Sequence, residues 1–121
     1  MLLEKEQRGD AWILRPRRDL MGGEETRELE TAIREISNAG TPRIVVDLAK
    51  ISYLNSTGLG SLVSAHMSCQ NRQGSLRLAN ISKRISNIFI ITKLALVFET
   101  FDSVDEALAG VNRTQLGSTE S

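Results

Sequence analysis

The stretch Arg43–Met67, with the sequence RIVVDLAKISYLNSTGLGSLVSAHM, decides how the rest of this 121-residue chain is arranged. It begins with the continuous β-branched run Ile44–Val46, which is typical of a central strand covered on both faces. The polar loop Asn55–Gly60 follows. The second half carries apolar residues at helical spacing, namely Leu59, Leu62, Val63, His66 and Met67. We therefore predict a buried strand, a short loop and a helix that begins near Thr57.

The segments on either side of this stretch alternate between strand and helix patterns. Leu2–Arg8 and Ala11–Pro16 flank a glycine-containing turn and predict an N-terminal hairpin. The remaining patterns predict a helix between Glu24 and Gly40, a strand at Ser75–Ala79, a helix capped by Ser82, a strand around Leu96–Thr100 and a short helix from Ser103 to Leu108. This order predicts an α/β fold with a single mixed sheet of about five strands, first a hairpin and then mainly parallel, packed with about four helices. We expect residues 1–110 to form this domain and residues 111–121 to form a flexible C-terminal tail.

The composition and the spacing of reactive residues argue against several classes of function. Fifteen basic and fifteen acidic residues cancel, so the chain lacks the broad cationic surface of a nucleic-acid-binding protein. Cys69 and His66 are the only cysteine and the only histidine, and no metal-ligand spacing surrounds them. We expect no metal and no cofactor. No nucleophile and base can be assembled into a catalytic arrangement, so we also expect the protein not to be an enzyme.

The most apolar run, Ile88–Phe98, bears on a membrane location. It is interrupted by Lys93 and is too short to span a bilayer. The N-terminal sequence becomes charged at Glu4, unlike a secretory signal peptide. We therefore expect no membrane partner and a cytoplasmic location.

The loop Asn55–Gly60 combines hydroxyl groups with glycines at a predicted helix start. Ser56 or Thr57 can cap the helix, and the same helix terminus tolerates an attached phosphate. Gly58 and Gly60 lie in the first turn, where each costs up to about 1 kcal/mol relative to alanine. We interpret that cost as room for an approaching partner. Local physics also allows a plainer reading, in which the hydroxyls only cap and the glycines only form a loop.

Three segments resemble the STAS domain of bacterial anti-sigma factor antagonists, and the resemblance extends from about Trp12 to Ala109. They are DLAKISYLNSTGLGSLV at 47–63, GSLRLANISKRI at 74–85 and ITKLALVFETFDSVDEAL at 91–108. The family motif is a strand ending in Asp-Leu, followed by Asp-Ser-Ser/Thr-Gly-Leu-Gly. Asp47, Leu48 and the segment Ser56–Gly60 match it. The resemblance implies that an anti-sigma factor with serine kinase activity phosphorylates Ser56, with Thr57 as the second choice.

The resemblance also implies how such a switch works. The unphosphorylated antagonist binds the kinase and frees a sigma factor, phosphorylation reverses this, and a phosphatase resets it. We predict a partner-binding surface made of Asn55, Ser56, Thr57, Gly58, Leu59, Gly60, Gly22 and Gly23. We expect a monomer or weak homodimer that contacts no nucleic acid directly.

Two positions depart from the family pattern and keep an alternative open. Asn55 replaces the acidic residue that precedes the serine, and Arg18 stands where glycine is common. They favour a constitutive STAS scaffold or interaction module that phosphate does not switch. A sensor for a nucleotide or small anion is the second alternative, because a glycine-flanked helix start can hold an anion.

Overall fold

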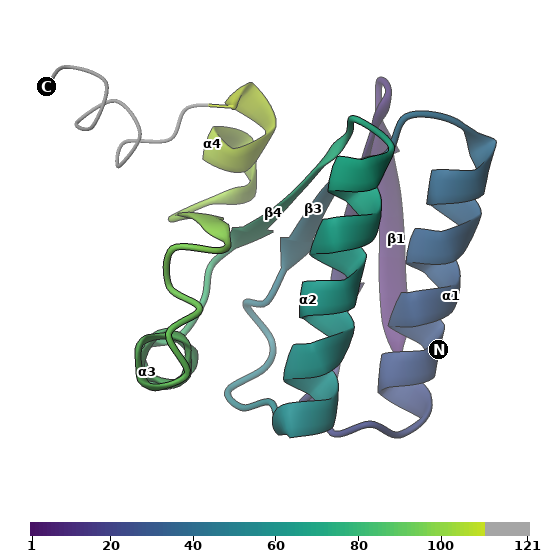
Figure 1. The fold of residues 1–121 in the computed structure, drawn as a ribbon. Helices are drawn as coiled ribbons and strands as arrows, with labels where there is room; N and C mark the ends of the chain where they lie inside the picture. Colours follow the sequence, from purple (N-terminus) through teal and green to yellow (C-terminus); the bar gives the residue numbers. More distant parts are fainter. Residues whose placement is uncertain (111–121) are drawn as a thin grey trace, which may run out of the picture.

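The computed structural model describes residues 1–110, which form one five-stranded sheet in the order β1-β2-β3-β4-β5 (Figure 1). Strands β1 (Leu3–Arg8) and β2 (Ala11–Pro16) form an antiparallel hairpin. Strands β3 (Arg43–Asp47), β4 (Ser75–Ala79) and β5 (Glu99–Phe101) continue the sheet in parallel. The helices are α1 (Glu24–Ala39), α2 (Ser56–Asn71), α3 (Lys83–Ile91) and α4 (Val104–Ala109). The predicted mixed sheet with its four helices is confirmed, while the predicted tail lies outside the described residues.

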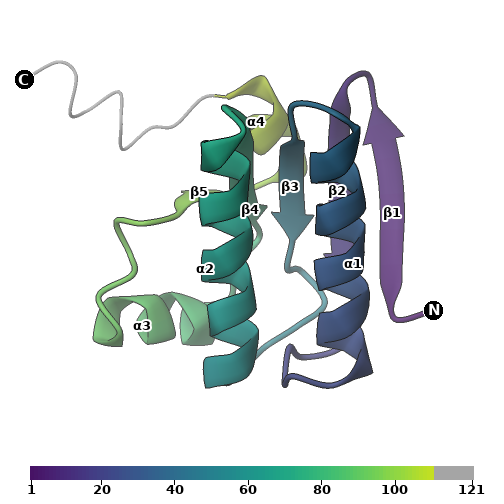
Figure 2. The ribbon, with the colours of Figure 1, turned by 45° about the vertical axis from the view of Figure 1, so that its right-hand side comes forward.

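Helices cover the two faces of the sheet unequally. Helices α1 and α2 lie side by side over one face, and α4 lies on the other (Figure 2). The larger core forms under α1 and α2 from residues such as Leu14, Ile44 and Leu62, and α4 closes a smaller cluster with Ile13 and Val45. The sheet therefore has apolar residues on both faces at its centre.

Strand β3 is the central strand that its composition predicts. Ile44, Val45 and Val46 are 1%, 3% and 0% exposed, and they alternate between the two cores. Burying each such side chain contributes about 1.5–3 kcal/mol, so this strand is a major source of stability.

The hairpin carries charged residues on the same face of the sheet as α4, where Arg8 of β1 donates to Asp105 of α4 at 3.1 Å. The guanidinium of Arg15 donates to Glu6 at 2.8 Å and to Asp47 at 3.1 Å. Arg8 donates to Glu6 at 2.6 Å. Charges of this kind also protect edge strand β1 against pairing with another chain.

The last strand begins later than the sequence predicts. The pattern favoured a strand around Leu96–Thr100, but β5 comprises Glu99–Phe101, and Leu96 is 95% exposed. The intervening residues form turns instead, with Lys93 in the left-handed conformation at φ 63° and Val97 N–H donating to the Leu94 carbonyl. Among residues 1–110, no helix has the length and apolar character needed to cross a membrane.

Candidate functional site

Asn55 caps helix α2, a role that the sequence analysis gave to Ser56 or Thr57. Its side-chain Oδ1 accepts a hydrogen bond from the Gly58 backbone N–H at 2.9 Å. Its Nδ2 donates to the Met21 carbonyl at 3.0 Å. The prediction was wrong because Asn55, in extended conformation, immediately precedes the first helical residue, Ser56. The Ser56 hydroxyl is thereby left free of a capping role.

Asn55 belongs to a pair of loops that precede the two long helices. We call residues 19–26 and 51–58, which include the first residues of α1 and α2, the paired loops. Leu20 forms an isolated parallel bridge with Leu54, and the Asn55 N–H donates to the Leu20 carbonyl at 3.1 Å. Figure 2 shows both loops at the end of the molecule where α1 and α2 begin. Backbone hydrogen bonds therefore hold the site as one unit.

Asp19 strengthens this pairing from the first loop. Its Oδ1 accepts the backbone N–H of Ser52 at 2.9 Å and of Tyr53 at 3.3 Å. The sequence analysis did not include Asp19 in the site. An acidic residue directly before a buried leucine was the available signal, but its partners lie more than thirty residues away in sequence.

Gly58 is required by packing inside the protein, which corrects its predicted role. A Cβ added there would lie 2.1 Å from the Leu20 carbonyl oxygen, far below van der Waals contact. Gly22, at φ 84°, faces the Thr57 side chain, and an added Cβ would lie 2.8 Å from Thr57 Cγ2. The paired loops thus approach each other too closely for side chains at either glycine. At Gly58, the room we assigned to a partner is filled by Leu20.

Gly60 and Ser56 form the open part of the site. A Cβ added at Gly60 would meet nothing within 4 Å, so no internal contact requires glycine there. Ser56 is exposed, and within residues 1–110 its hydroxyl makes no hydrogen bond. Thr57 is exposed too, but its side chain packs toward Gly22. Ser56 is therefore the more accessible hydroxyl.

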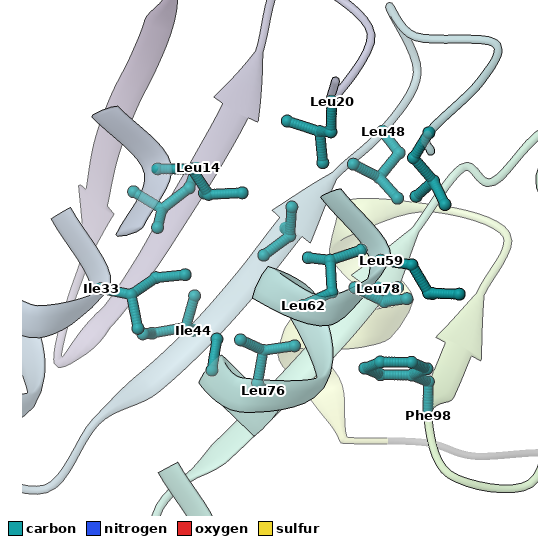
Figure 3. Packing of buried hydrophobic residues seen from close by; sticks show 14 of the residues in the cluster. Leu14, Leu20, Ile33, Ile44, Leu48, Leu59, Leu62, Leu76, Leu78 and Phe98 are labelled. Atoms are coloured by element: carbon teal, nitrogen blue, oxygen red, sulfur yellow. The ribbon is translucent and has the colours of Figure 1, made fainter. Parts of the chain in front are cut away.

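Leu59 points away from this open surface. It is 9% exposed and belongs to the larger core (Figure 3). Its side chain leaves little surface for a partner, so its main contribution is to fix α2 on the sheet. Of the predicted site residues, the structure brings together Asn55, Ser56, Thr57 and Gly22, and it directs Leu59 inward.

Glu25 organises the first of the paired loops and was not among the predicted site residues. The carboxylate is buried, which by itself raises its pKa. Hydrogen bonds from the backbone N–H groups of Met21 (2.8 Å) and Gly23 (2.9 Å) and from the Thr26 hydroxyl (2.9 Å) more than offset burial. The net effect lowers the pKa of Glu25 to about 2. A permanent carboxylate therefore holds the turn that carries Met21 and Gly22.

Asp47 anchors the strand end on the other side of the site. It is 7% exposed and accepts hydrogen bonds from the Arg15 Nε (3.1 Å), the Ala49 N–H (3.1 Å) and the Asn80 amide (2.9 Å). Asn80 stands in the left-handed conformation at φ 59°. Asp47 therefore fixes the turns that follow β3 and β4, which is a structural role.

The remaining reactive side chains serve the core. His66 is 9% exposed, and its ring packs edge-on against Phe98 with centroids 5.4 Å apart. His66 therefore packs at the edge of the core. Burial raises the pKa of the Cys69 thiol to about 11, although neighbouring Ser37 opposes the shift. Within residues 1–110, no three His, Cys, Asp or Glu side chains gather closely enough to hold a metal ion.

The sequence is similar to those of several anti-sigma-B factor antagonists. The anti-sigma-B factor antagonist of Listeria monocytogenes is 43% identical over 54 residues, which are 45% of this chain and 47% of that protein. The protein of the same name from Staphylococcus epidermidis is 36% identical over 67 residues, or 55% of this chain and 62% of that protein. In both cases the match spans less than two thirds of the relative's length.

Solved structures share the fold at lower sequence identity. A proposed anti-sigma factor antagonist from Thermotoga maritima has a TM-score of 0.81 at 21% identity, covering 92% of this chain and 95% of that one. The phosphorylated form of the Bacillus cell fate determinant SpoIIAA has a TM-score of 0.70 at 16% identity, covering 88% and 96%. The sequence model of the STAS domain matches residues 3–107. Because this match spans nearly all of the described residues, the chain belongs to the STAS domain family.

Proposed function

We propose that this protein is a cytoplasmic anti-sigma factor antagonist whose docking is switched off by phosphorylation of Ser56. Its partners are an anti-sigma factor with serine kinase activity and a phosphatase that resets the switch, so it regulates transcription indirectly. One observation carries the proposal: the exposed, unbonded hydroxyl of Ser56 at the first residue of α2. The names of the Listeria and Staphylococcus relatives support the same class.

The local structure suits a phosphate at this position. In the transfer, Ser56 Oγ attacks the γ-phosphorus of ATP, the bond to ADP breaks, and the hydroxyl proton passes to a base of the kinase. The backbone N–H groups of Ser56 and Thr57 have no partner elsewhere in residues 1–110 and can donate to the new phosphate. The helix dipole also favours an anion there. The fold therefore tolerates the modification.

The same phosphate changes what a partner meets. It adds roughly −1.5 to −2 charges beside Gly60, where the surface is open, and near Met21, whose side chain is 47% exposed. Met21 is tied to the α2 cap through the Asn55 amide. Because the paired loops are held by hydrogen bonds, we expect the charge to alter docking without unfolding the site.

The test is a kinase reaction with purified protein, ATP and each anti-sigma factor kinase encoded in the same genome. Mass spectrometry of the digest should locate one phosphate on Ser56. Ser56→Ala should abolish it, whereas the matched variant Thr57→Val should retain it. A phosphate that persists in Ser56→Ala, or none in the unaltered protein with any of these kinases, would reject the switch.

A constitutive docking module is the second candidate, because Asn55 removes the negative charge that precedes the serine in the family motif. It predicts that Ser56→Ala and Ser56→Asp bind the same anti-sigma factor with equal affinity. The phosphorylation switch predicts that Ser56→Asp binds at least tenfold more weakly. The new carboxylate would be buried at the interface without a cationic partner or beside a like charge, and this costs over about 1.4 kcal/mol. Calorimetric titration of both variants distinguishes the two.

A further inference from the structure

Four aliphatic side chains at the end of α3 and in the turns that follow it are exposed without a role in folding or in the site above. Ile90, Ile91, Leu96 and Val97 are 60%, 78%, 95% and 36% exposed. We call these four residues the α3 tip. They belong to the apolar run whose other members, such as Phe89 and Phe98, fill the core. The core therefore explains part of that run and leaves the α3 tip unexplained.

Three basic residues, Lys83, Arg84 and Lys93, lie in α3 or in the turns that follow it, and the next acidic residue is Glu99. From Leu48 to Phe98 the chain contains six basic residues and no acidic one. Lys50 and Arg77 pair with Glu4 and Glu99, and within residues 1–110 the other four, Arg72, Lys83, Arg84 and Lys93, form no ion pair. Lys83 and Arg84 begin α3, and Lys93 lies inside the apolar run. Arg84 lies over the Tyr53 ring at 4.6 Å. A chain with no net charge thus places uncompensated positive charge beside its exposed aliphatic residues.

The position of the α3 tip allows contact with a broad surface. Helix α3 lies to one side of α2, on the side away from α1, and the chain after it runs along the outside of the molecule toward β5 (Figures 1 and 2). We expected no membrane partner because the run Ile88–Phe98 is too short to span a bilayer. That length limits spanning and leaves docking on a membrane surface open.

We propose that the α3 tip docks on an anionic lipid surface, with its aliphatic side chains entering the headgroup boundary and Lys83, Arg84 and Lys93 facing the lipid charges. Protein interfaces are enriched in aromatic residues and arginine and depleted of lysine, whereas the α3 tip has no aromatic residue and two flanking lysines. Two copies of this chain would bring like charges together at the same patch. A membrane surface suits both the aliphatic side chains and the cations.

Sedimentation with sucrose-loaded vesicles tests the proposal on the full chain. The vesicles contain either phosphatidylcholine alone or an equimolar mixture of phosphatidylcholine and phosphatidylserine. We expect binding only to the mixture, with about a fivefold loss for each cation removed by Lys83→Ser or Lys93→Asn. The double variant I91S/L96S should bind at least about tenfold more weakly. Arg34→Ser removes a cation from α1 and should bind as the unaltered protein does.

A second double variant, I91L/L96I, keeps the apolar area at the same positions and should retain binding. Circular dichroism should show all variants folded, because the substituted side chains are exposed. Absence of binding to the mixed vesicles would overturn the proposal, as would equal binding to phosphatidylcholine alone. Unchanged vesicle binding of I91S/L96S would also overturn it. The same holds if no vesicle binding occurs and sedimentation velocity shows that the unaltered protein is a dimer whereas I91S/L96S is a monomer.

Discussion

Substituting alanine for Gly58 and for Gly60 should change stability in opposite directions, although both glycines lie near the start of α2. At Gly58 the added Cβ would lie 2.1 Å from the Leu20 carbonyl oxygen, so the loops must separate by about 1 Å or more to restore van der Waals contact. This overpacking costs about 1–3 kcal/mol. Separation also weakens the hydrogen bonds that Asn55 makes to Leu20 and Met21, each contributing about 1 kcal/mol.

Alanine has a higher helix propensity than glycine, which offsets up to about 1 kcal/mol of these costs. Gly58→Ala should therefore destabilise the domain by about 2–4 kcal/mol. Gly60→Ala meets no atom within 4 Å and should stabilise it by up to about 1 kcal/mol. Urea unfolding followed by circular dichroism measures both changes in the free energy of unfolding. In thermal unfolding, the midpoint temperature of Gly58→Ala should fall by about 10 °C. If Gly58→Ala were as stable as the unaltered protein, the close packing of the paired loops would be refuted. Gly60→Ala also provides a folded variant for binding assays, in which a methyl group is added to the open surface beside Ser56.

Four further substitutions or treatments probe the site and the core. Glu25→Gln should lose about 3 kcal/mol at neutral pH, because a pKa of about 2 against an ordinary 4.5 stabilises the folded state above about pH 4.5. In urea titrations the unaltered protein should lose that stability as the pH falls toward 2, and the variant should lack this pH dependence. Asp47→Asn should cost about 1–3 kcal/mol in the same unfolding assay, since a buried acceptor of three hydrogen bonds loses its charge. Asn55→Asp should cost about 1 kcal/mol because a carboxylate cannot donate to the Met21 carbonyl, and a more stable variant would contradict this. Cys69, whose pKa is raised to about 11, should react with a thiol reagent at about pH 8 only after the protein is unfolded, which mass spectrometry can follow.

The sheet could be predicted from sequence because its signals are local. The β-branched run Ile44–Val46 marks the central strand, and the glycine turn after Leu2–Arg8 marks the hairpin. The last strand was misplaced because Leu96 and Phe98 alternate like a strand although the chain turns there. Periodicity in so short a segment does not separate a strand from a series of turns.

The site was harder to predict because its contacts join segments far apart in the sequence. The motif located Ser56 and Asn55, yet we assigned the helix cap to Ser56 or Thr57, whereas Asn55 is the cap. That choice depends on Met21, whose carbonyl accepts from the amide of Asn55. Gly58 was correctly predicted to be important, but for the wrong reason. Glycine is needed there because the Leu20 backbone lies against it, and not because a partner protein approaches. Glu25 offered only a charge at a helix start, because burial and its backbone donors appear only in three dimensions.

Asn55 connects the fold with the proposed switch, because it lies directly before Ser56 and bonds both loops. Its side chain uses both ends of an amide, accepting from Gly58 and donating to Met21, so it ties the two loops together. An aspartate could reproduce only the first of these bonds. In this chain the amide of Asn55 therefore supplies a link to Met21 that a carboxylate could not make. The rigidity of the loop that carries Ser56 then depends on hydrogen bonding at position 55 and not on charge there. Accessibility of the hydroxyl and the proposed recognition by a kinase can therefore be tested separately.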